Sequence, residues 1–400
     1  MLIGVKLPGP EAASALERHK GDDAMKIKAA VLRSMGAPMP YAHSQPLHIE
    51  EVDLDRPGRD EVLVKIEAAG LCHSDLSVIN GSRPRPLPMA IGHEAAGVVV
   101  EAGDGVDDLK PGDHVVMVFM PSCGHCQPCS QGRPALCEPG AVANGKGELL
   151  TGAIRLHEGA ETIHHHLGCS AFADHAVVSR RSLVRIDKDI PLDVAALFGC
   201  AVLTGVGAVV NTARVQAGET VAVVGLGGVG LAAVLGALAA GAARVVAVDL
   251  SPEKLQLATD LGATGVVDAR AADAIEQVRA LTGGGADFVF EFAGSARALE
   301  NAYKMTKRGG TTVTAGLPPP DAVLPVNIVS LVAEERTVKG SYIGTCVPVR
   351  DVPRYIELYK AGRLPVDRLM SGRIPLEDIN EGFDRLHEGS VVSLVVDFQG

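Results

Sequence analysis

The chain has 400 residues, of which 47% are hydrophobic and 21% are charged, and its formal net charge at pH 7 is −11. This length and composition predict a soluble chain of about two or three domains and exclude a small scaffold or a disordered chain. The excess of acidic residues disfavours nonspecific attraction to nucleic acid or to an anionic membrane, so a small-molecule partner is favoured. Forty-six glycines, no tryptophan and only 3% aromatic residues are typical of a parallel sheet packed between helices.

Residues 1–25 predict an N-terminal extension that takes no part in the fold. This segment lacks the continuous apolar core of a secretory signal, and Met25 stands directly before the first strand pattern. We therefore expect a cytoplasmic protein. Residues 221–243 carry no charge and are long enough for a membrane span. The glycines that follow the strand-like start of that segment divide it into a buried strand, a tight turn and a helix, so no span is predicted.

Short strand patterns separated by glycine and proline turns fill the first predicted domain, residues 26–201. Three of them cover 61–70, 95–103 and 113–119. This pattern predicts a mainly antiparallel, barrel-like β domain.

Strand and helix patterns alternate along the second predicted domain, residues 202–343. The predicted strands cover 221–225, 244–249, 264–268, 287–294 and 311–316, and the predicted helices cover 228–241, 251–262, 271–282 and 295–305. Such alternation predicts a doubly wound parallel sheet with right-handed crossovers. The last segment, 344–400, returns to mixed structure, with helices near 351–361 and 377–388 and a strand at 393–398. We therefore expect an α/β fold in which the nucleotide-type domain is inserted between two parts of the first domain.

The run GLGGVG matches the dinucleotide-binding pattern GxGxxG, directly after a predicted strand and at the start of a predicted helix. Gly225 allows the tight turn, Gly227 lets the backbone approach a pyrophosphate, and Gly230 lets the helix pack closely on the strand. Gly228 and Val229 open the helix, whose free N–H groups favour phosphate.

An acidic residue completes this pattern. Asp249 ends the next predicted strand, where a carboxylate bonds the ribose hydroxyls and repels a 2′-phosphate, which predicts NAD rather than NADP. Lys254, one helical turn further, is compatible with a place beside the adenosine ribose and equally with a solvated helix surface.

Four of the eight cysteines fall within fifteen positions, at Cys123, Cys126, Cys129 and Cys137. In a chain without a secretory signal this crowding favours a metal over disulfides. Four thiolates close a tetrahedral zinc site, and a closed site is typically structural. An exported disulfide protein, a nucleic-acid zinc ribbon and an iron–sulfur cluster remain alternatives, although the single basic residue of the loop, Arg133, argues against the ribbon.

A second group of ligand types is scattered along the chain. Cys72, His93 and Cys200 supply two thiolates and an imidazole and leave a fourth zinc position for water or substrate. Their spacing alone does not pair them, and buried core residues are the alternative. Asp75 in GLCHSD and Glu94 in GHEAAG stand next to these ligand types and suit a supporting hydrogen-bond role.

Five motifs in order, spread over 26–400, carry a family resemblance: GLCHSD, GHEAAG, the four-cysteine loop, FGCAVLTGVGA and GLGGVG with Asp249. The chain resembles the zinc-containing alcohol dehydrogenases of the medium-chain dehydrogenase/reductase superfamily, in the long form of the liver-type and glutathione-dependent formaldehyde dehydrogenases. The resemblance implies a Rossmann domain inserted into a GroES-like catalytic domain. It also implies NAD, two zinc ions per subunit, a homodimer, and reversible oxidation of an alcohol to an aldehyde or ketone.

Position by position, the resemblance makes Cys72, His93 and Cys200 the catalytic zinc ligands and Glu94 an occasional ligand. It implies that Asp75 orients His93. The remaining implied roles belong to Ser74 on the alcohol proton, Phe119 and Arg83 at the substrate pocket, His73 at the pyrophosphate and Thr204 at the nicotinamide.

Three departures from the family stand out. Ser77 replaces a histidine that passes the proton to solvent in many members, and residues 388–396 lack the arginine that often binds phosphate. Arg83 stands where relatives carry smaller, apolar or acidic residues. With Arg85 it is compatible with a polar or anionic substrate and equally with a solvated loop.

Two other functions remain open at this point. The first is an S-(hydroxymethyl)glutathione dehydrogenase, the glutathione-dependent formaldehyde dehydrogenase of the family. The second is a non-catalytic zinc- or nucleotide-binding regulator that keeps the fold without the activity. The sequence names neither the alcohol nor the direction of the reaction.

Overall fold

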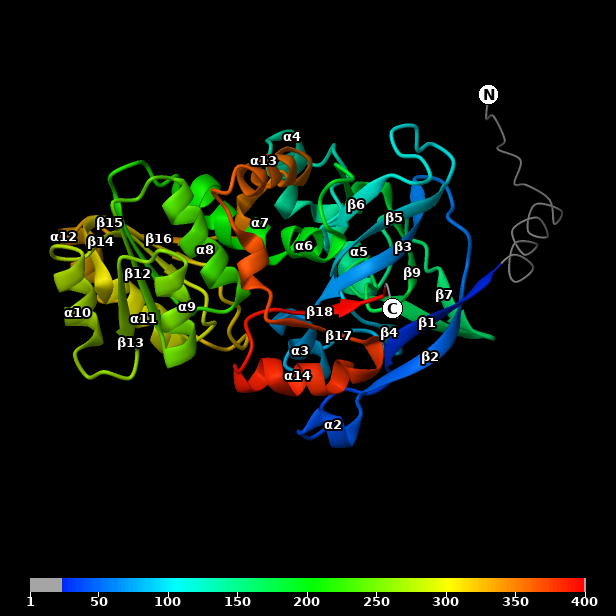
Figure 1. The fold of residues 1–400 in the computed structure, drawn as a ribbon, viewed down its shortest axis with the longest axis horizontal. Coiled ribbons are helices and arrows are strands. Elements are labelled where there is room, and N and C mark those ends of the chain that lie inside the picture. The colour runs from blue at the N-terminus through cyan, green and yellow to red at the C-terminus, as the bar shows by residue number, and fades with distance from the viewer. Residues whose placement is uncertain (1–23, 399–400) are drawn as a thin grey trace, which may run out of the picture.

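The computed structural model describes residues 24–398, so all but the last two residues of the predicted extension 1–25 lie outside the described chain. Figure 1 shows two regions side by side, a helix-covered parallel sheet and a β-rich region. The orange and red C-terminal segments run from the first region back to the second.

A small closed barrel occupies one end of the β-rich region. Its strands follow the order β1 (Met25–Leu32), β2 (Leu47–Leu54), β7 (Leu156–Glu158), β8 (Glu161–His165) and β4 (Met89–Ala90). β1 and β2 pair antiparallel over their full length, whereas β4 and β8 pair in parallel. Residues that alternate along β1 and β2, such as Ile27, Val52 and Leu54, fill the barrel core.

The second sheet carries the C-terminal return. Its order is β10 (Leu183–Ile186), β6 (His114–Met117), β5 (Glu94–Ala102), β3 (Glu61–Gly70), β18 (Leu394–Asp397) and β17 (Gly372–Ile374), and β9 (His175–Ser179) also pairs with β3. β3 lies inside the sheet, with β5 on one edge and β9 and β18 on the other, and most of its residues are buried. Pairing of β18 with β3 joins residues more than 300 positions apart.

The third sheet is entirely parallel, in the order β13 (Gly265–Asp268), β12 (Arg244–Asp249), β11 (Thr220–Val224), β14 (Ala286–Glu291), β15 (Thr306–Thr314) and β16 (Thr337–Gly340). Numbered within the sheet, this is the 3-2-1-4-5-6 order of dinucleotide-binding folds. The strand order reverses between β11 and β14, and ligands of such sheets bind beyond the strand ends at that point. The loop after β11 is the GLGGVG run.

Helices cover the sheets and connect them. They are α2 (Tyr41–Ser44), α3 (His73–Ile79), α4 (Gln127–Ser130), α5 (Glu138–Lys146), α6 (Leu192–Ala196), α7 (Ala201–Gly207), α8 (Gly228–Ala239), α9 (Pro252–Asp260), α10 (Ala274–Leu281), α11 (Ala296–Met305), α12 (Ile328–Ala333), α13 (Pro348–Lys360) and α14 (Ile379–Glu388). α7 packs on α8 through small residues: a Cβ on Gly236 would lie 3.0 Å from the Cα of Val206. One continuous hydrophobic core therefore runs from the β-rich region into the parallel sheet.

The predicted alternation of strands and helices is present, but several elements were missed, among them α7, β16 and α12. β16 and α12 follow a proline-rich stretch and are only four and six residues long, too short for a periodic pattern. The predicted division of 221–243 matches β11 and α8. Within residues 24–398, no single helix has both the length and the apolarity for a membrane span; the bent pair Leu192–Gly199 and Ala201–Ala213 passes only when its two parts are joined.

Candidate active site

Four buried or half-buried ligand groups from three distant segments meet at one point. Cys72 caps the start of α3, His93 and Glu94 lie at the start of β5, and Cys200 precedes α7. Their ligand atoms all lie within 4.8 Å of one another. The structure thus brings together the predicted catalytic ligands, which spacing alone did not pair.

Two of the four ligand atoms in this cluster have no hydrogen-bond partner among the described residues, as a cation site favours. His93 is fully buried, and its Nδ1–H donates to Oδ1 of Asp75 at 2.8 Å. Its other ring nitrogen, Nε2, and Oε1 of Glu94 are buried and bond to no described residue. Two thiols, an imidazole and a carboxylate with unused lone pairs form a donor set that suits zinc.

The electrostatics of the cluster are those of a concentrated negative site. Hydrogen bonding from Cys200, followed by the influence of His93, lowers the pKa of Cys72 well below that of an ordinary thiol. Burial, and then the charge of Cys72, raises the pKa of Glu94 well above its usual value. A bound cation removes this mutual repulsion, so the chemistry of the site fits a metal ion.

Asp75 holds two of the ligand residues in place through hydrogen bonds. Its Oδ2 accepts the N–H of Cys72 at 3.1 Å and caps α3, and its Oδ1 holds His93. His166, which is 1% exposed, places its Nδ1 3.2 Å from that same oxygen. Burial alone would raise the pKa of Asp75, but the two imidazoles lower it well below its usual value. Sequence reasoning missed His166; the run of three histidines at 164–166 was its only signal.

The glycine loop meets the structural demands of dinucleotide binding. Gly225 has a φ of +90°, which side chains disfavour, and a Cβ on Gly230 would overlap the carbonyl oxygen of Gly225. Above Gly227 there is open space where a pyrophosphate would approach, at the start of the twelve-residue helix α8. Asp249 accepts the N–H groups of Leu226 at 2.6 Å and Ser251 at 2.9 Å, so it also shapes this loop.

One cleft of about 460 Å³ joins the glycine loop to the ligand cluster. Its lining contains most of the predicted site residues: Cys72, His73, Ser74, Arg83, Glu94, Gly225, Gly227, Gly228, Val229, Gly230, Asp249 and Lys254. His387 of α14 also lines it, a residue that sequence reasoning did not single out. The cleft is therefore long enough to expose both groups of residues to one ligand.

Thr204 and Phe119, like Asp75, His93 and Cys200, are not part of the cleft lining. Thr204 is half-buried on α7 and is not part of the cleft lining, in which the same helix is represented by Ala201. Phe119 is buried, and its ring meets the edge of His93 at 5.2 Å between centroids. Tyr342, which was not predicted, contacts Phe119 at 6.2 Å on the other side.

Ser77 lines the cleft, but its hydroxyl proton is used within its own helix. It donates to the backbone carbonyl of His73 at 2.8 Å, within the same helix. Ser74 and His73 remain as the cleft-lining groups next to Cys72.

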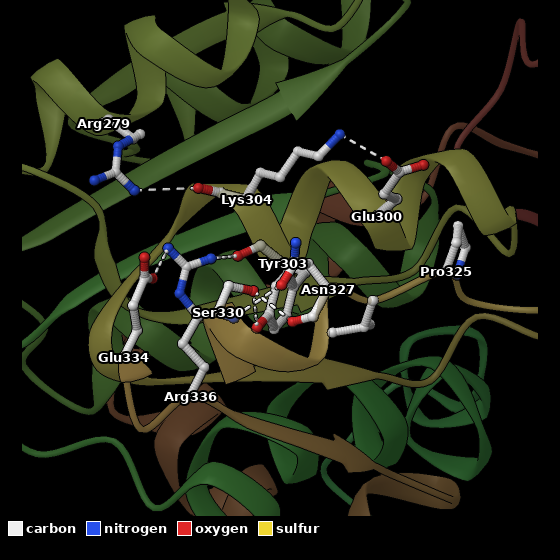
Figure 2. Close-up of a pocket in the computed structure, with 10 residues that line it drawn as sticks. Arg279, Glu300, Tyr303, Lys304, Pro325, Asn327, Ser330, Glu334 and Arg336 are labelled. Carbon is white, nitrogen blue, oxygen red and sulfur yellow. Dashed lines mark hydrogen bonds and ion pairs between the residues drawn. The ribbon is translucent and has the colours of Figure 1, made fainter. Parts of the chain in front are cut away.

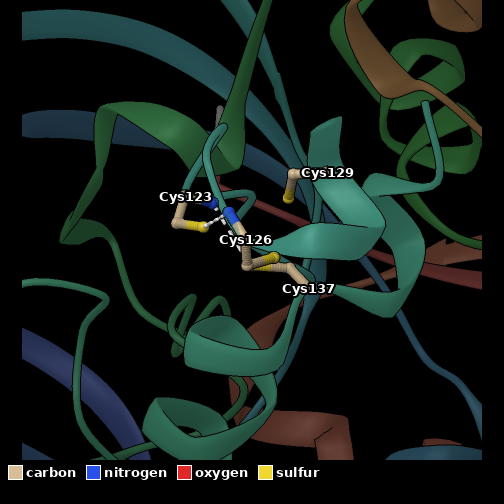
Figure 3. A group of neighbouring side chains, drawn as sticks. All are labelled: Cys123, Cys126, Cys129 and Cys137. Atoms are coloured by element: carbon tan, nitrogen blue, oxygen red, sulfur yellow. Dashed lines mark hydrogen bonds between the residues drawn. The ribbon is translucent and has the colours of Figure 1, made fainter. Parts of the chain in front are cut away.

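The four-cysteine loop forms a second cluster, in which the sulfur atoms of Cys123, Cys126, Cys129 and Cys137 lie within 4.8 Å of one another (Figure 3). Backbone N–H groups point at the sulfurs: Cys123 and Gly140 donate to Cys137 at 3.2 and 3.4 Å. The N–H of Cys129 lowers the pKa of Cys126 to about 7. Four unlinked sulfurs facing one point fit a closed, tetrahedral metal site.

Comparisons with known proteins agree with this architecture. Residues 58–188 match the family model described as the alcohol dehydrogenase GroES-like domain, and residues 228–361 match that of the zinc-binding dehydrogenase. An NDMA-dependent alcohol dehydrogenase from Amycolatopsis methanolica is 40% identical over 93% of this chain and 99% of its own length. The chain belongs to the zinc-binding alcohol dehydrogenases.

Two further relatives of this alcohol dehydrogenase extend the comparison. A class-3 alcohol dehydrogenase from Myxine glutinosa is 37% identical over 90% of this chain and 96% of its own length. The crystal structure of benzyl alcohol dehydrogenase from Acinetobacter calcoaceticus superposes with a TM-score of 0.87 at 30% identity, over 93% of this chain and 99% of that one. The predicted fold, a Rossmann-type sheet together with a GroES-like β domain, is confirmed.

Proposed function

We propose that this alcohol dehydrogenase is zinc- and NAD-dependent and reversibly oxidises an alcohol to an aldehyde or ketone. The observation that carries the proposal is that Cys72 and Glu94 of the ligand cluster and the GLGGVG loop line the same cleft. Cys72, His93 and Cys200 would hold the catalytic zinc, with Glu94 as a further donor. The four-cysteine loop would hold a structural zinc.

Each absent group would supply one kind of chemistry. Bound zinc acts as a Lewis acid toward a hydroxyl oxygen, and bound NAD accepts a hydride. The chain's own residues do the rest. Asp75 fixes the ring of His93 so that Nε2 faces the two sulfurs, and Ser74, beside Cys72 in the cleft, takes the proton of the alcohol. Since Ser77 is bonded to the helix, the proton leaves by His73 or by water.

The direct test is NAD⁺ reduction, followed by NADH absorbance, with primary, secondary, aromatic and acidic alcohols before and after zinc chelation. We expect turnover that the chelator removes and zinc restores. NDMA is included as an alternative acceptor because a relative is named for it. Formaldehyde with and without glutathione tests the S-(hydroxymethyl)glutathione activity, for which the class-3 relative is the reason. Absence of turnover in the zinc-loaded protein would favour a binding-only regulator.

The choice of NAD over NADP rests on Asp249. We expect wild-type protein to prefer NAD, and Asp249→Asn to lower kcat/KM for NAD by roughly tenfold, chiefly through KM, because a charge-assisted hydrogen bond to ribose is weakened. Steady-state kinetics with both cofactors measures this. Asp260→Asn, at the far end of α9, is the matched control. A preference for NADP in the wild type would contradict the assignment.

We also propose a homodimer formed through the nucleotide-binding sheet. All four residues of the edge strand β16 are exposed, and on α12 Ile328, Val329 and Val332 are 74%, 73% and 71% exposed. An unpaired edge beside an apolar helix face is suited to pairing with a second copy.

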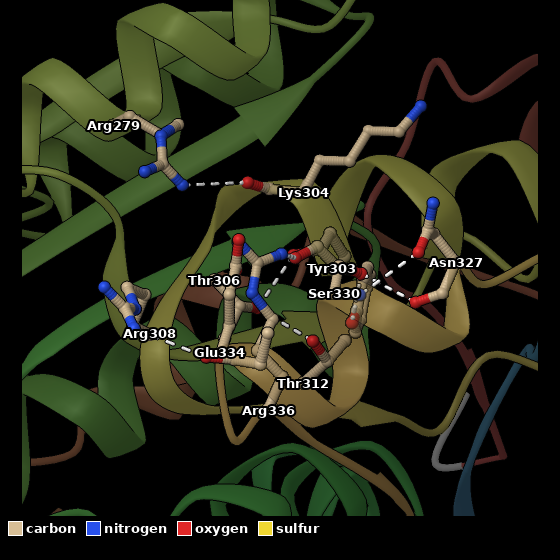
Figure 4. A network of polar contacts seen from close by, with 12 residues as sticks. Arg279, Tyr303, Lys304, Thr306, Arg308, Thr312, Asn327, Ser330, Glu334 and Arg336 are labelled. Carbon is tan, nitrogen blue, oxygen red and sulfur yellow. Dashed lines mark hydrogen bonds and ion pairs between the residues drawn. The ribbon is translucent and has the colours of Figure 1, made fainter.

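A polar network lies next to this surface. Beneath α12 lies a cleft of about 700 Å³, lined by Tyr303, Ser330 and Arg336 among others (Figure 2). Arg336 donates to the carbonyl of Tyr303 at 2.6 Å and lies over its ring, and the hydroxyl of Tyr303 bonds Ser330 at 3.0 Å (Figure 4). These contacts join Ser330 of α12 and Arg336, directly before β16, to Tyr303 of α11.

Val329→Asp is therefore expected to convert the dimer to a monomer, because a carboxylate would be buried at the interface without a partner. Size-exclusion chromatography with light scattering gives the mass of each form. Val142→Asp, at a 58% exposed valine of α5, is the matched control and should remain dimeric. A monomeric wild type would overturn the dimer.

The domain boundaries 26–201, 202–343 and 344–400 and the cytoplasmic location remain predictions, as do the roles of individual site residues. Limited proteolysis followed by mass spectrometry tests the boundaries, because cleavage concentrates in exposed connecting segments.

A further inference from the structure

Two arginines, one in the cleft lining and one two residues further along the chain, form no ion pair with a described carboxylate. Arg83 lines the cleft together with Ser74 and Glu94, and Arg85 follows two residues later on the same loop. Both side chains are half-buried. Within residues 24–398, neither forms an ion pair, whereas arginines such as Arg33 and Arg180 pair with glutamate or aspartate.

The hydrogen-bonding capacity of this pair is almost unused. Arg83 makes a single long contact, from Nη2 to the carbonyl of Pro318 at 3.5 Å. Nε of Arg85 is buried and has no hydrogen-bond partner among the described residues. Burial, followed by the charge of Arg85, lowers the pKa of Arg83. Two adjacent cations with unsatisfied donors in a partly buried place are unfavourable unless an anion joins them.

The loop that holds the arginines is fixed. The N–H of Arg83 donates to the carbonyl of Ser77 at 2.9 Å, and Ser82 bonds the side chain of Asn80 at 2.7 Å. The guanidinium groups are therefore presented from a defined backbone rather than from a free segment.

Two aromatic rings pack between the surroundings of the arginines and the ligand cluster. Tyr342 lies close enough to Arg83, Arg85 and Cys200 for all three to influence its pKa, which burial raises. The ring of Tyr342 contacts Phe119, and Phe119 contacts His93. Arg83 and the candidate zinc ligands Cys72 and Glu94 line the same cleft, so one molecule in the cleft can meet both.

We propose that the substrate is an alcohol bearing an anionic group, of the carboxylate type, which Arg83 and Arg85 bind while its hydroxyl faces Cys72, His93 and Cys200. This inference rests on the proposed dehydrogenase function and names its substrate class. The planar guanidinium fork matches a carboxylate in two parallel hydrogen bonds. An apolar spacer between hydroxyl and carboxylate suits the apolar side chains of the cleft lining, such as Leu76 and Leu317.

The test compares 4-(hydroxymethyl)benzoate with its neutral counterpart 4-(hydroxymethyl)benzamide in the wild type, Arg83→Gln and Arg85→Gln. We expect the ratio of kcat/KM, anionic over neutral, to exceed ten in the wild type. In each variant it should fall by roughly 10- to 100-fold through a higher KM, as expected for loss of a charge-assisted hydrogen bond. A purely structural role would change both substrates alike and leave the ratio unmoved. Arg181→Gln, at an exposed arginine outside the cleft, is the control.

Binding of 4-methylbenzoate, measured by calorimetry on the zinc-loaded enzyme, gives a readout independent of turnover. Weaker binding to Arg85→Gln than to the wild type supports the inference, and equal binding overturns it. If neutral alcohols are oxidised without anionic preference, the inference fails and the dehydrogenase stands. If no alcohol is oxidised, the proposed function fails, and the calorimetry alone decides whether the arginine pair binds carboxylates.

Discussion

Replacing Cys200 by serine is expected to lower alcohol turnover by at least about a thousandfold, since the proposed catalytic zinc would be lost with its ligand. Cys200 is 6% exposed and faces Cys72, His93 and Glu94 within 4.8 Å. A hydroxyl is a much poorer zinc ligand than a thiolate, so the metal content should fall from two ions per chain to one. Steady-state kinetics and elemental analysis of the same sample measure both effects.

The control for this substitution is Cys346→Ser. Cys346 is also buried, but it belongs to neither cysteine cluster, so it should keep both metal ions and most of the activity. A Cys200→Ser protein that turns over alcohol normally with one zinc ion would reject the catalytic assignment. Unchanged thermal stability in Cys200→Ser would show that the loss is chemical rather than a failure to fold.

The parts of the site that the sequence predicted are those with local signatures. The residues of GLGGVG form one turn and the start of one helix, so the strand, the glycines and the helix could be recognised together in the sequence. The four cysteines lie in one short loop, and their spacing alone predicts a metal site. Cys72, His93 and Cys200 are different, because only the family resemblance joined them before the fold did.

The residues that were missed act through long-range packing. His166 reaches Asp75 from a loop 91 positions away, and Tyr342 reaches Phe119 from beyond the edge strand β16. Neither has a spacing that marks it in the sequence. His387 enters the cleft because β18 pairs with β3 and brings α14 alongside. Such residues become visible only when sheet topology is known, because a single sequence carries periodicity and motifs but no record of which strands pair.

The second large effect is expected at the other cluster, where Cys137→Ser should destabilise the protein rather than disable its chemistry. Cys137 is fully buried at the start of α5 and accepts N–H groups from both Cys123 and Gly140. A closed four-thiolate site contributes its binding free energy directly to folding, so losing one ligand releases the loop. We expect Tm to fall by on the order of 10 °C. Because 1 kcal/mol of stability shifts Tm by about 2–4 °C for domains of this size, this fall corresponds to several kcal/mol.

Differential scanning fluorimetry, zinc content and limited proteolysis of residues 123–146 together separate this effect from catalysis. The variant should lose one zinc ion, melt earlier and be cut first in this loop, while protein that is still folded turns over alcohol. Cys169→Ser, at a buried cysteine outside the loop, is the control and should keep the loop protected. A Cys137→Ser protein with two zinc ions and an unchanged Tm would contradict the structural role. The four-cysteine cluster has no place for substrate, whereas the cluster that contains Cys200 opens into the cleft. Cys137→Ser should therefore lose mainly stability, and Cys200→Ser should lose mainly activity.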